Sequence, residues 1–88
     1  PILGAQAANE LLNVEGVKAS FVLTDYNNVI YISARAIDEV NVQVIMEKLG
    51  GGGHMNVAGA QVSGYTMQET LHMVKGIIDE MQREGELE

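Results

Sequence analysis

The chain has 88 residues, the size of one small domain with a single modest core. A hydrophobic fraction of 47% excludes a disordered tail, and the absence of cysteine excludes disulfide scaffolds, zinc fingers and thiol nucleophiles. The formal net charge of −7 argues against nonspecific binding of long nucleic acids, although locally concentrated positive charge can still bind a small anion. No run of about 18 apolar residues is visible, so we expect a cytoplasmic domain without direct membrane contact.

The first half of the chain predicts a helix followed by a β-hairpin. Small and apolar residues recur with helical spacing over 2–13, which favours a helix. Residues 17–24 alternate between apolar and polar side chains, as a half-buried strand does. The segment 25–28 contains two Asn residues and is typical of a tight turn, so 29–34 is expected to form the returning strand.

The second half predicts two amphipathic helices with clear N-terminal signals. After a loop, Asn41 is suited to cap a helix that ends at Gly50, because its side chain can accept from an unpaired backbone N–H. Thr66 and Glu69 have the T-x-x-E spacing of a capping box. The last helix should therefore begin after Thr66 and continue to about Arg83.

A short strand over 58–62 completes the predicted elements. The expected fold is α+β, with a small mixed sheet that includes the hairpin and with helices packed on it, in the order α-β-β-α-β-α. We expect residues 1–88 to form one domain of a longer protein. The acidic segment 84–88 is predicted to be a disordered tail or a cloning remnant.

Four consecutive glycines followed by a histidine are the most distinctive feature of the sequence: Gly50, Gly51, Gly52, Gly53 and His54. Ordering this run is entropically costly, so it suggests a backbone geometry that other residues cannot adopt. The run can supply backbone N–H groups to an anion or let a planar ligand lie on the main chain, with His54 as a neighbouring donor. The structural alternative is a helix C-cap followed by a flexible loop. The spacing matches neither a P-loop nor G-x-G-x-x-G.

Three further polar residues have both a functional and a structural interpretation. Arg35, at the end of the second predicted strand, is either a solvated charge or a bidentate clamp for a phosphate. Gln61 either reads the edge of a base or faces solvent. His72 lies off the apolar stripe of the last helix, so we interpret it as a surface residue.

Four short motifs together resemble the DHH-associated domain. They are I-S-A-R at 32–35, N-V at 41–42, E-K-L-G-G-G-G-H at 47–54 and A-G-A-Q at 58–61. The resemblance covers nearly the whole chain, and the stretch that contains the glycines is long and specific. This domain follows the catalytic DHH domain in RecJ-like exonucleases, nanoRNase/phosphoadenosine phosphatases and cyclic-di-AMP phosphodiesterases. The chain looks most similar to the membrane-anchored cyclic-di-AMP phosphodiesterases of Gram-positive bacteria.

The resemblance implies a substrate-binding domain for cyclic-di-AMP or short oligonucleotides. It assigns phosphate and base binding to Gly51, Gly52, Gly53 and His54, and also to Arg35. The family often has Ser after this Arg, whereas this chain has Ala36, so a hydroxyl contact there is lost. The resemblance places two metals, Mn²⁺ or similar, in the DHH domain. The chain lacks a D-H-H motif, so we expect it to bind without hydrolysing and to hold no metal or cofactor itself.

Two alternatives from other functional classes remain open. The related domain also occurs at the C-terminus of alanyl-tRNA synthetases, so a noncatalytic RNA- or DNA-binding module is one alternative. An exposed strand edge can also pair across a two-fold axis, which makes a homodimerisation domain the other. The expected partners are therefore a cyclic dinucleotide or short oligonucleotide, the parent's DHH domain and a second copy. A membrane-anchored parent would keep this domain in the cytoplasm.

Overall fold

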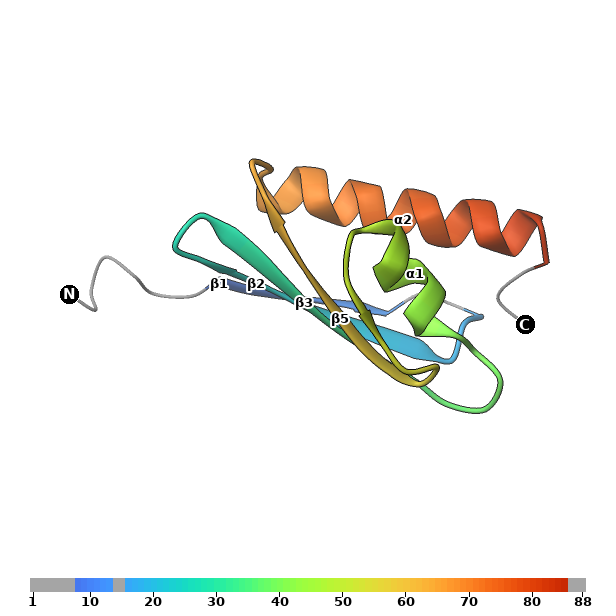
Figure 1. The fold of residues 1–88 in the computed structure, drawn as a ribbon. Coiled ribbons are helices and arrows are strands. Elements are labelled where there is room, and N and C mark those ends of the chain that lie inside the picture. Colours follow the sequence, from blue (N-terminus) through green and yellow to red (C-terminus); the bar gives the residue numbers. More distant parts are fainter. Residues whose placement is uncertain (1–7, 14–15, 86–88) are drawn as a thin grey trace.

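Two helices cover one face of a five-stranded sheet in the computed structural model, which describes residues 8–13 and 16–85 (Figure 1). The strands follow the order β1-β2-β3-β5-β4, and every neighbouring pair is antiparallel. The strands are β1 (Ala8–Asn13), β2 (Ala19–Tyr26), β3 (Val29–Ala36), β4 (Gly52–Gly53) and β5 (Val57–Ser63), and the helices are α1 (Val42–Lys48) and α2 (Met67–Arg83).

The prediction of a helix over 2–13 is wrong for its second half, and the sheet is antiparallel rather than mixed. Residues 8–13 form β1, which pairs with β2 along its whole length, while 2–7 lie outside the described residues. The observed order is therefore β-β-β-α-β-β-α. Helix propensity amounts to tenths of a kcal/mol per residue, and pairing with the edge of β2 overrides it here. Leu12 packs against the core, whereas Leu11 is 63% exposed.

The predicted hairpin is confirmed, with small differences in its bounds. The first strand covers 19–26 rather than 17–24, and the second covers 29–36 rather than 29–34. β2 and β3 are joined at Asn27 and Asn28, whose φ angles are 54° and 65°. Positive φ at both central residues is the geometry that suits the twist of a two-residue hairpin, and Asn tolerates it. The hairpin therefore follows from local turn chemistry.

The core lies between the sheet and the helices, and alternation along the strands decides which residues enter it. In β3, Ile30, Ile32 and Ala34 are buried, whereas the intervening Tyr31 and Ser33 are exposed. The face of the sheet that carries these intervening residues, with Arg35 and their partners on β2 and β5, is here called the open face. The rest of the core consists of Phe21, Leu23, Val40, Val42, Ile45, Met46, Ala58, Ala60, Val62, Val74, Ile78 and Met81.

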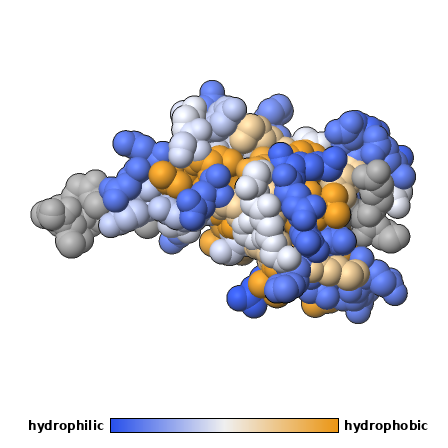
Figure 2. Space-filling model, viewed as in Figure 1, coloured by the Kyte–Doolittle hydropathy of each residue, from blue (hydrophilic) through white to orange (hydrophobic). Residues whose placement is uncertain are grey.

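Some apolar surface remains visible outside the core. Figure 2, drawn from the same side as Figure 1, shows apolar patches (orange) between polar side chains (blue). On the open face, Leu11 pairs directly with Val22, and both are exposed. A domain of this size cannot bury all of its apolar surface, and the open face has no second layer among the described residues.

Both predicted helix starts are confirmed. The Asn41 side chain accepts hydrogen bonds from the backbone of Gln43 (2.9 Å) and Val44 (3.4 Å). At α2, the Thr66 hydroxyl accepts from the Glu69 backbone (3.0 Å), and the Glu69 carboxylate accepts from the Thr66 backbone (2.9 Å). These reciprocal bonds satisfy backbone donors that the first turn of a helix leaves unpaired.

We expect Thr66→Ala to lower the free energy of unfolding by about 1 kcal/mol, because the Glu69 backbone N–H loses its acceptor. For a domain of this size that corresponds to a drop in Tm of about 4–8 °C. Thermal melting followed by circular dichroism measures the change. Thr66→Ser keeps the hydroxyl and serves as the control, and equal melting of all three proteins would contradict the capping role.

The end of α2 and the predicted tail are only partly within the described residues. The backbone N–H of Glu84 donates to the Glu80 carbonyl (3.1 Å), so the helix cap takes up the first residue of the segment 84–88. Residues 86–88 lie outside the described residues. Within 8–13 and 16–85, neither helix combines the length and the apolar character needed to cross a membrane.

Candidate functional site

The four glycines have different structural roles, and the first of them ends α1. Gly50 has a φ of +87°, and its N–H donates to the Glu47 carbonyl (3.1 Å). The next amide, Gly51 N–H, donates to the Met46 carbonyl (2.8 Å). This pair of bonds is a Schellman cap, which requires a left-handed residue at the position of Gly50. The C-cap interpretation is therefore correct for Gly50.

Close packing against β5 explains two more of the glycines. A Cβ on Gly51 would lie 2.1 Å from the Gly59 carbonyl oxygen and 2.7 Å from the Ala60 Cα. A Cβ on Gly53 would lie 2.5 Å from the Ala58 Cα, and the φ of +143° at Gly53 is itself unfavourable for other residues. These glycines allow the chain leaving α1 to lie directly on β5.

Gly52 is the one residue of the run for which the described structure provides no such reason. Its φ lies outside the left-handed region, and an added Cβ would meet nothing within 4 Å. Gly52 belongs to the short strand β4 and pairs with Gly59 of β5. The segment after the helix cap is therefore a paired strand and not a flexible loop. A position that tolerates a side chain within the domain but has none is suited to close approach by something outside it.

His54 is exposed and begins a tight turn that returns to β5. Its backbone exchanges two hydrogen bonds with Val57, N–H to carbonyl at 2.7 Å and carbonyl from N–H at 3.3 Å. Asn56 holds the turn in place, because its side-chain amide donates to the Val40 carbonyl (3.1 Å) and the Asp38 carbonyl (3.4 Å). Asn56 thus has a structural role that the sequence did not show.

The strand register brings Arg35 and His54 into one row across the sheet. Val57 of β5 lies between the two: it pairs with Arg35 of β3 on one side, and on the side of β4 it exchanges backbone hydrogen bonds with His54. Two strand spacings of about 4.8 Å separate the two backbones by about 10 Å. Both residues are exposed, and cross-strand partners share a face, so the long Arg35 side chain can reach an anion that His54 also contacts.

A shallow depression lies beside the glycine run. It has a volume of about 550 Å³, within the usual range for small-molecule sites, and backbone from Gly50, Gly51 and Gly59 borders it. Tyr31, Ser33 and Gln61 of the open face line it, and Ile32 and Ala60 of the same strands, whose side chains are buried in the core, border it as well. The sequence analysis considered Gln61 but missed Tyr31 and Ser33. Alternation in the predicted strand was a usable signal, because both share the face of Arg35.

Arg35 does not line that depression but a second one, of about 400 Å³, at the start of β2 and the end of β3. Lys18, Ser20 and Asn13 border it as well. Lys18 forms an exposed ion pair with Asp38 (2.9 Å), which in water contributes little to stability. Arg35 and Lys18 thus border the same depression, and because Asp38 offsets the charge of Lys18, Arg35 supplies most of the positive charge there.

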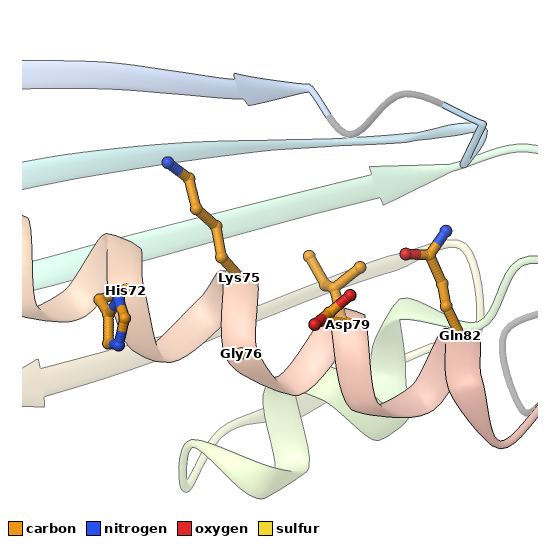
Figure 3. A pocket seen from close by; sticks show the side chains of 6 residues that line it. His72, Lys75, Gly76, Asp79 and Gln82 are labelled. Atoms are coloured by element: carbon orange, nitrogen blue, oxygen red, sulfur yellow. The ribbon is translucent and has the colours of Figure 1, made fainter.

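A third depression, of about 430 Å³, lies on α2 and is unrelated to the glycine run. Figure 3 shows that its labelled residues His72, Lys75, Gly76, Asp79 and Gln82 all come from this one helix. His72 is exposed, which agrees with its interpretation as a surface residue. Across 8–13 and 16–85, no three His, Cys, Asp or Glu side chains are grouped so that they could hold a metal ion.

Comparison with known proteins matches residues 4–80 to the DHHA1 domain. Cyclic-di-AMP phosphodiesterase PdeA of Listeria monocytogenes is 48% identical over 79 residues, which are 89% of this chain and 12% of that protein. Cyclic-di-AMP phosphodiesterase GdpP of Bacillus subtilis is 48% identical over 80 residues, 90% of this chain and 12% of that protein. The bifunctional oligoribonuclease and PAP phosphatase NrnA of Thermus thermophilus is 35% identical over 75 residues, 84% of this chain and 23% of that protein.

The chain thus spans about an eighth of the length of the two phosphodiesterases. The residues of this chain that match the DHHA1 domain include the glycine-His segment and β3, which carries Arg35. The resemblance seen in the sequence motifs is confirmed at the level of the family. By its sequence and by the match over most of its length, this chain belongs to the DHHA1 domain family.

Proposed function

We propose that this domain binds the phosphodiester substrate of a longer phosphodiesterase, a cyclic dinucleotide such as cyclic-di-AMP or a short oligonucleotide. The observation that carries the proposal is Gly52, which lacks a side chain at a place where the fold leaves room for one. A ligand that lies against the main chain there explains this choice. The names of the relatives, two of them cyclic-di-AMP phosphodiesterases, support the class of ligand.

Each residue of the proposed site has a distinct task. Arg35 offers a positively charged guanidinium fork, which can form two parallel charge-assisted hydrogen bonds with a phosphate. His54 supplies a ring N–H to the same anion. Gly53 precedes His54, whose backbone exchanges two hydrogen bonds with Val57 of β5. Because successive N–H groups of a strand point in opposite directions, the Gly53 N–H points away from β5, to the outer edge of β4. Gly52 lets the ligand come close to these donors.

Hydrolysis itself requires groups that the described residues do not supply. Activation of water by two metal ions needs several carboxylate and imidazole ligands close together, and the described part of the chain has no such cluster. We therefore propose that a DHH domain elsewhere in the full-length protein holds the metals, Mn²⁺ or similar, and cuts the ligand that this domain presents. Binding and cleavage would then be divided between two domains.

We expect Gly52→Ala and His54→Ala each to weaken binding of cyclic-di-AMP by about tenfold, the equivalent of one lost contact of about 1.4 kcal/mol. Neither change should alter the free energy of unfolding by more than about 0.5 kcal/mol, because both positions are outside the core. Calorimetric titration of the 88-residue chain with cyclic-di-AMP and with the linear dinucleotide pApA measures the affinities, and thermal melting checks the fold.

The chain offers matched controls for both variants. Gly76 on α2 is an exposed glycine with nothing within 4 Å of an added Cβ, and His72 is the second histidine of the sequence. Gly76→Ala and His72→Ala should leave the affinity unchanged. If the wild-type chain binds neither dinucleotide even at millimolar concentration, or if the control variants weaken binding as much as the site variants, the proposed site is wrong.

A further inference from the structure

Tyr31 and Gln61 face each other across β3 and β5 at the wall of the depression beside the glycine run. They are direct cross-strand partners, so their side chains project from the same face at adjacent positions. Tyr31 is 39% exposed, and Gln61 is exposed as well. Within the described residues, neither the Tyr31 hydroxyl nor the Gln61 amide forms a hydrogen bond with the protein. Their polar groups are therefore available to a ligand.

The floor between them and the glycine run is formed by main chain. A Cβ on Gly51 would overlap the Gly59 carbonyl oxygen, and a Cβ on Gly59 would lie a tight 3.0 Å from the Ile32 carbonyl oxygen, so both positions favour glycine. A floor without side chains beside an aromatic ring is a suitable place for a flat heterocycle. Nucleic-acid-binding proteins use exposed aromatic rings in this way, because every base has a π-face on which a ring can stack.

The amide of Gln61 determines which base suits the depression. It presents one N–H donor and one carbonyl acceptor side by side. The edge of adenine at N6 and N7 offers the complementary donor and acceptor, whereas guanine at O6 and N7 offers two acceptors. One of the two bonds is therefore lost with guanine, and the Gln61 carbonyl would face another acceptor. Gln61 is thus suited to adenine.

The distances along the strands fit one nucleotide between the two groups of residues. Positions two apart on a strand lie about 7 Å from each other, so the Tyr31–Gln61 row is about 7 Å from the row of Ser33, Gly59 and Gly52. A phosphate bound near Gly52 and His54 would leave its sugar over Ser33 and its base over the depression. Three successive rows, the first with Arg35 and His54, the second with Ser33 and Gly52 and the third with Tyr31 and Gln61, therefore match the order phosphate, sugar, base.

We propose that Tyr31 and Gln61 form an adenine-binding subsite, in which Tyr31 stacks on the base and Gln61 reads its N6 and N7 edge. This inference rests on the proposed nucleotide-binding function and assigns specificity within it. Gln61 distinguishes adenine from guanine, and Tyr31 contributes affinity for both bases. The open face thereby holds both the phosphate end and the base end of the ligand.

The test compares cyclic-di-AMP with cyclic-di-GMP by calorimetric titration of the 88-residue chain. Gln61→Leu keeps the approximate size of the side chain but removes its polar groups, so affinity for cyclic-di-AMP should fall about tenfold while affinity for cyclic-di-GMP changes little. Tyr31→Ala should weaken both ligands by about ten- to a hundredfold, whereas Tyr31→Phe retains the ring and most of the affinity. Tyr65→Ala and Gln82→Leu, changes of exposed residues elsewhere, should alter neither affinity.

The outcomes separate this inference from the proposal on which it rests. If the wild-type chain binds neither dinucleotide, the proposed function fails and the subsite with it. If the wild-type chain binds and Gly52→Ala weakens binding, the phosphate site stands. The adenine subsite is nevertheless overturned if Gln61→Leu keeps the preference between the two ligands and Tyr31→Ala keeps both affinities. Loss of discrimination in Gln61→Leu with an unchanged melting temperature supports it.

Discussion

Gly51→Ala is expected to destabilise the domain by at least about 3 kcal/mol, a large part of the total stability of a small domain. The added Cβ would lie 2.1 Å from the Gly59 carbonyl oxygen and 2.7 Å from both Ala60 Cα and Ala60 Cβ. These atoms belong to the backbone of β5, or are attached directly to it, so no rotation of a flexible side chain can relieve the overlap. Either β4 or α1 must move away from β5.

Gly52→Ala, one residue along the same segment, is the matched control for this prediction. Its Cβ would meet nothing within 4 Å, so we expect its unfolding midpoint to equal that of the wild type within error. Urea unfolding followed by circular dichroism compares the three proteins. Equal midpoints for Gly51→Ala and the wild type would mean that the segment does not lie on β5 in solution as described.

Arg35→Ala is expected to weaken binding of cyclic-di-AMP by about ten- to a hundredfold, because a hydrogen bond between two charged groups contributes about 1.5–3 kcal/mol. Arg35→Lys should restore only part of the affinity, since an ammonium group cannot bind a phosphate through two parallel N–H groups. Arg35 is exposed and no hydrogen bond within the described residues depends on its side chain, so the melting temperature should not change.

Arg83, the second arginine of the sequence, provides the control for this experiment. It pairs with Asp79 (2.8 Å) on the exposed surface of α2, and Arg83→Ala should leave the affinity unchanged. Titrations at two salt concentrations add a second readout, because the contribution of an exposed charge falls as salt rises. Equal loss of affinity in both variants would show that Arg35 acts only through net charge and does not clamp the phosphate.

Local chemistry determined most of the elements from residue 19 onward. Positive φ at Asn27 and Asn28 closes the hairpin, and the caps at Asn41 and Thr66 begin the two helices, as predicted. Each of these signals depends on a few neighbouring residues and on atoms within one turn of the chain. Sequence motifs over nearly the whole chain also indicated the DHHA1 family, which the comparison confirmed.

The first strand and the short strand after α1 were not predictable in this way. The segment 8–13 has the composition of a helix and becomes β1 because β2 offers it a free edge to pair with. Gly52 and Gly53 form β4 only because Gly51 and Gly53 can lie against β5. In both cases a partner distant in sequence supplies the stabilising contacts, and these outweigh the weak preferences of the residues themselves.

For the candidate site, the sequence by itself determined the residue types, a glycine run with a histidine, an arginine and a glutamine. Only the tertiary structure decided how they are grouped. The register of β3, β5 and β4 places Arg35 in one row with His54, and Gln61 in another with Tyr31. The tertiary structure also distinguished Gly52, which the fold does not require to be glycine, from the other three glycines of the run, which it does. Those distinctions depend on which backbone atoms lie opposite each other, and such contacts exist only once the sheet has formed.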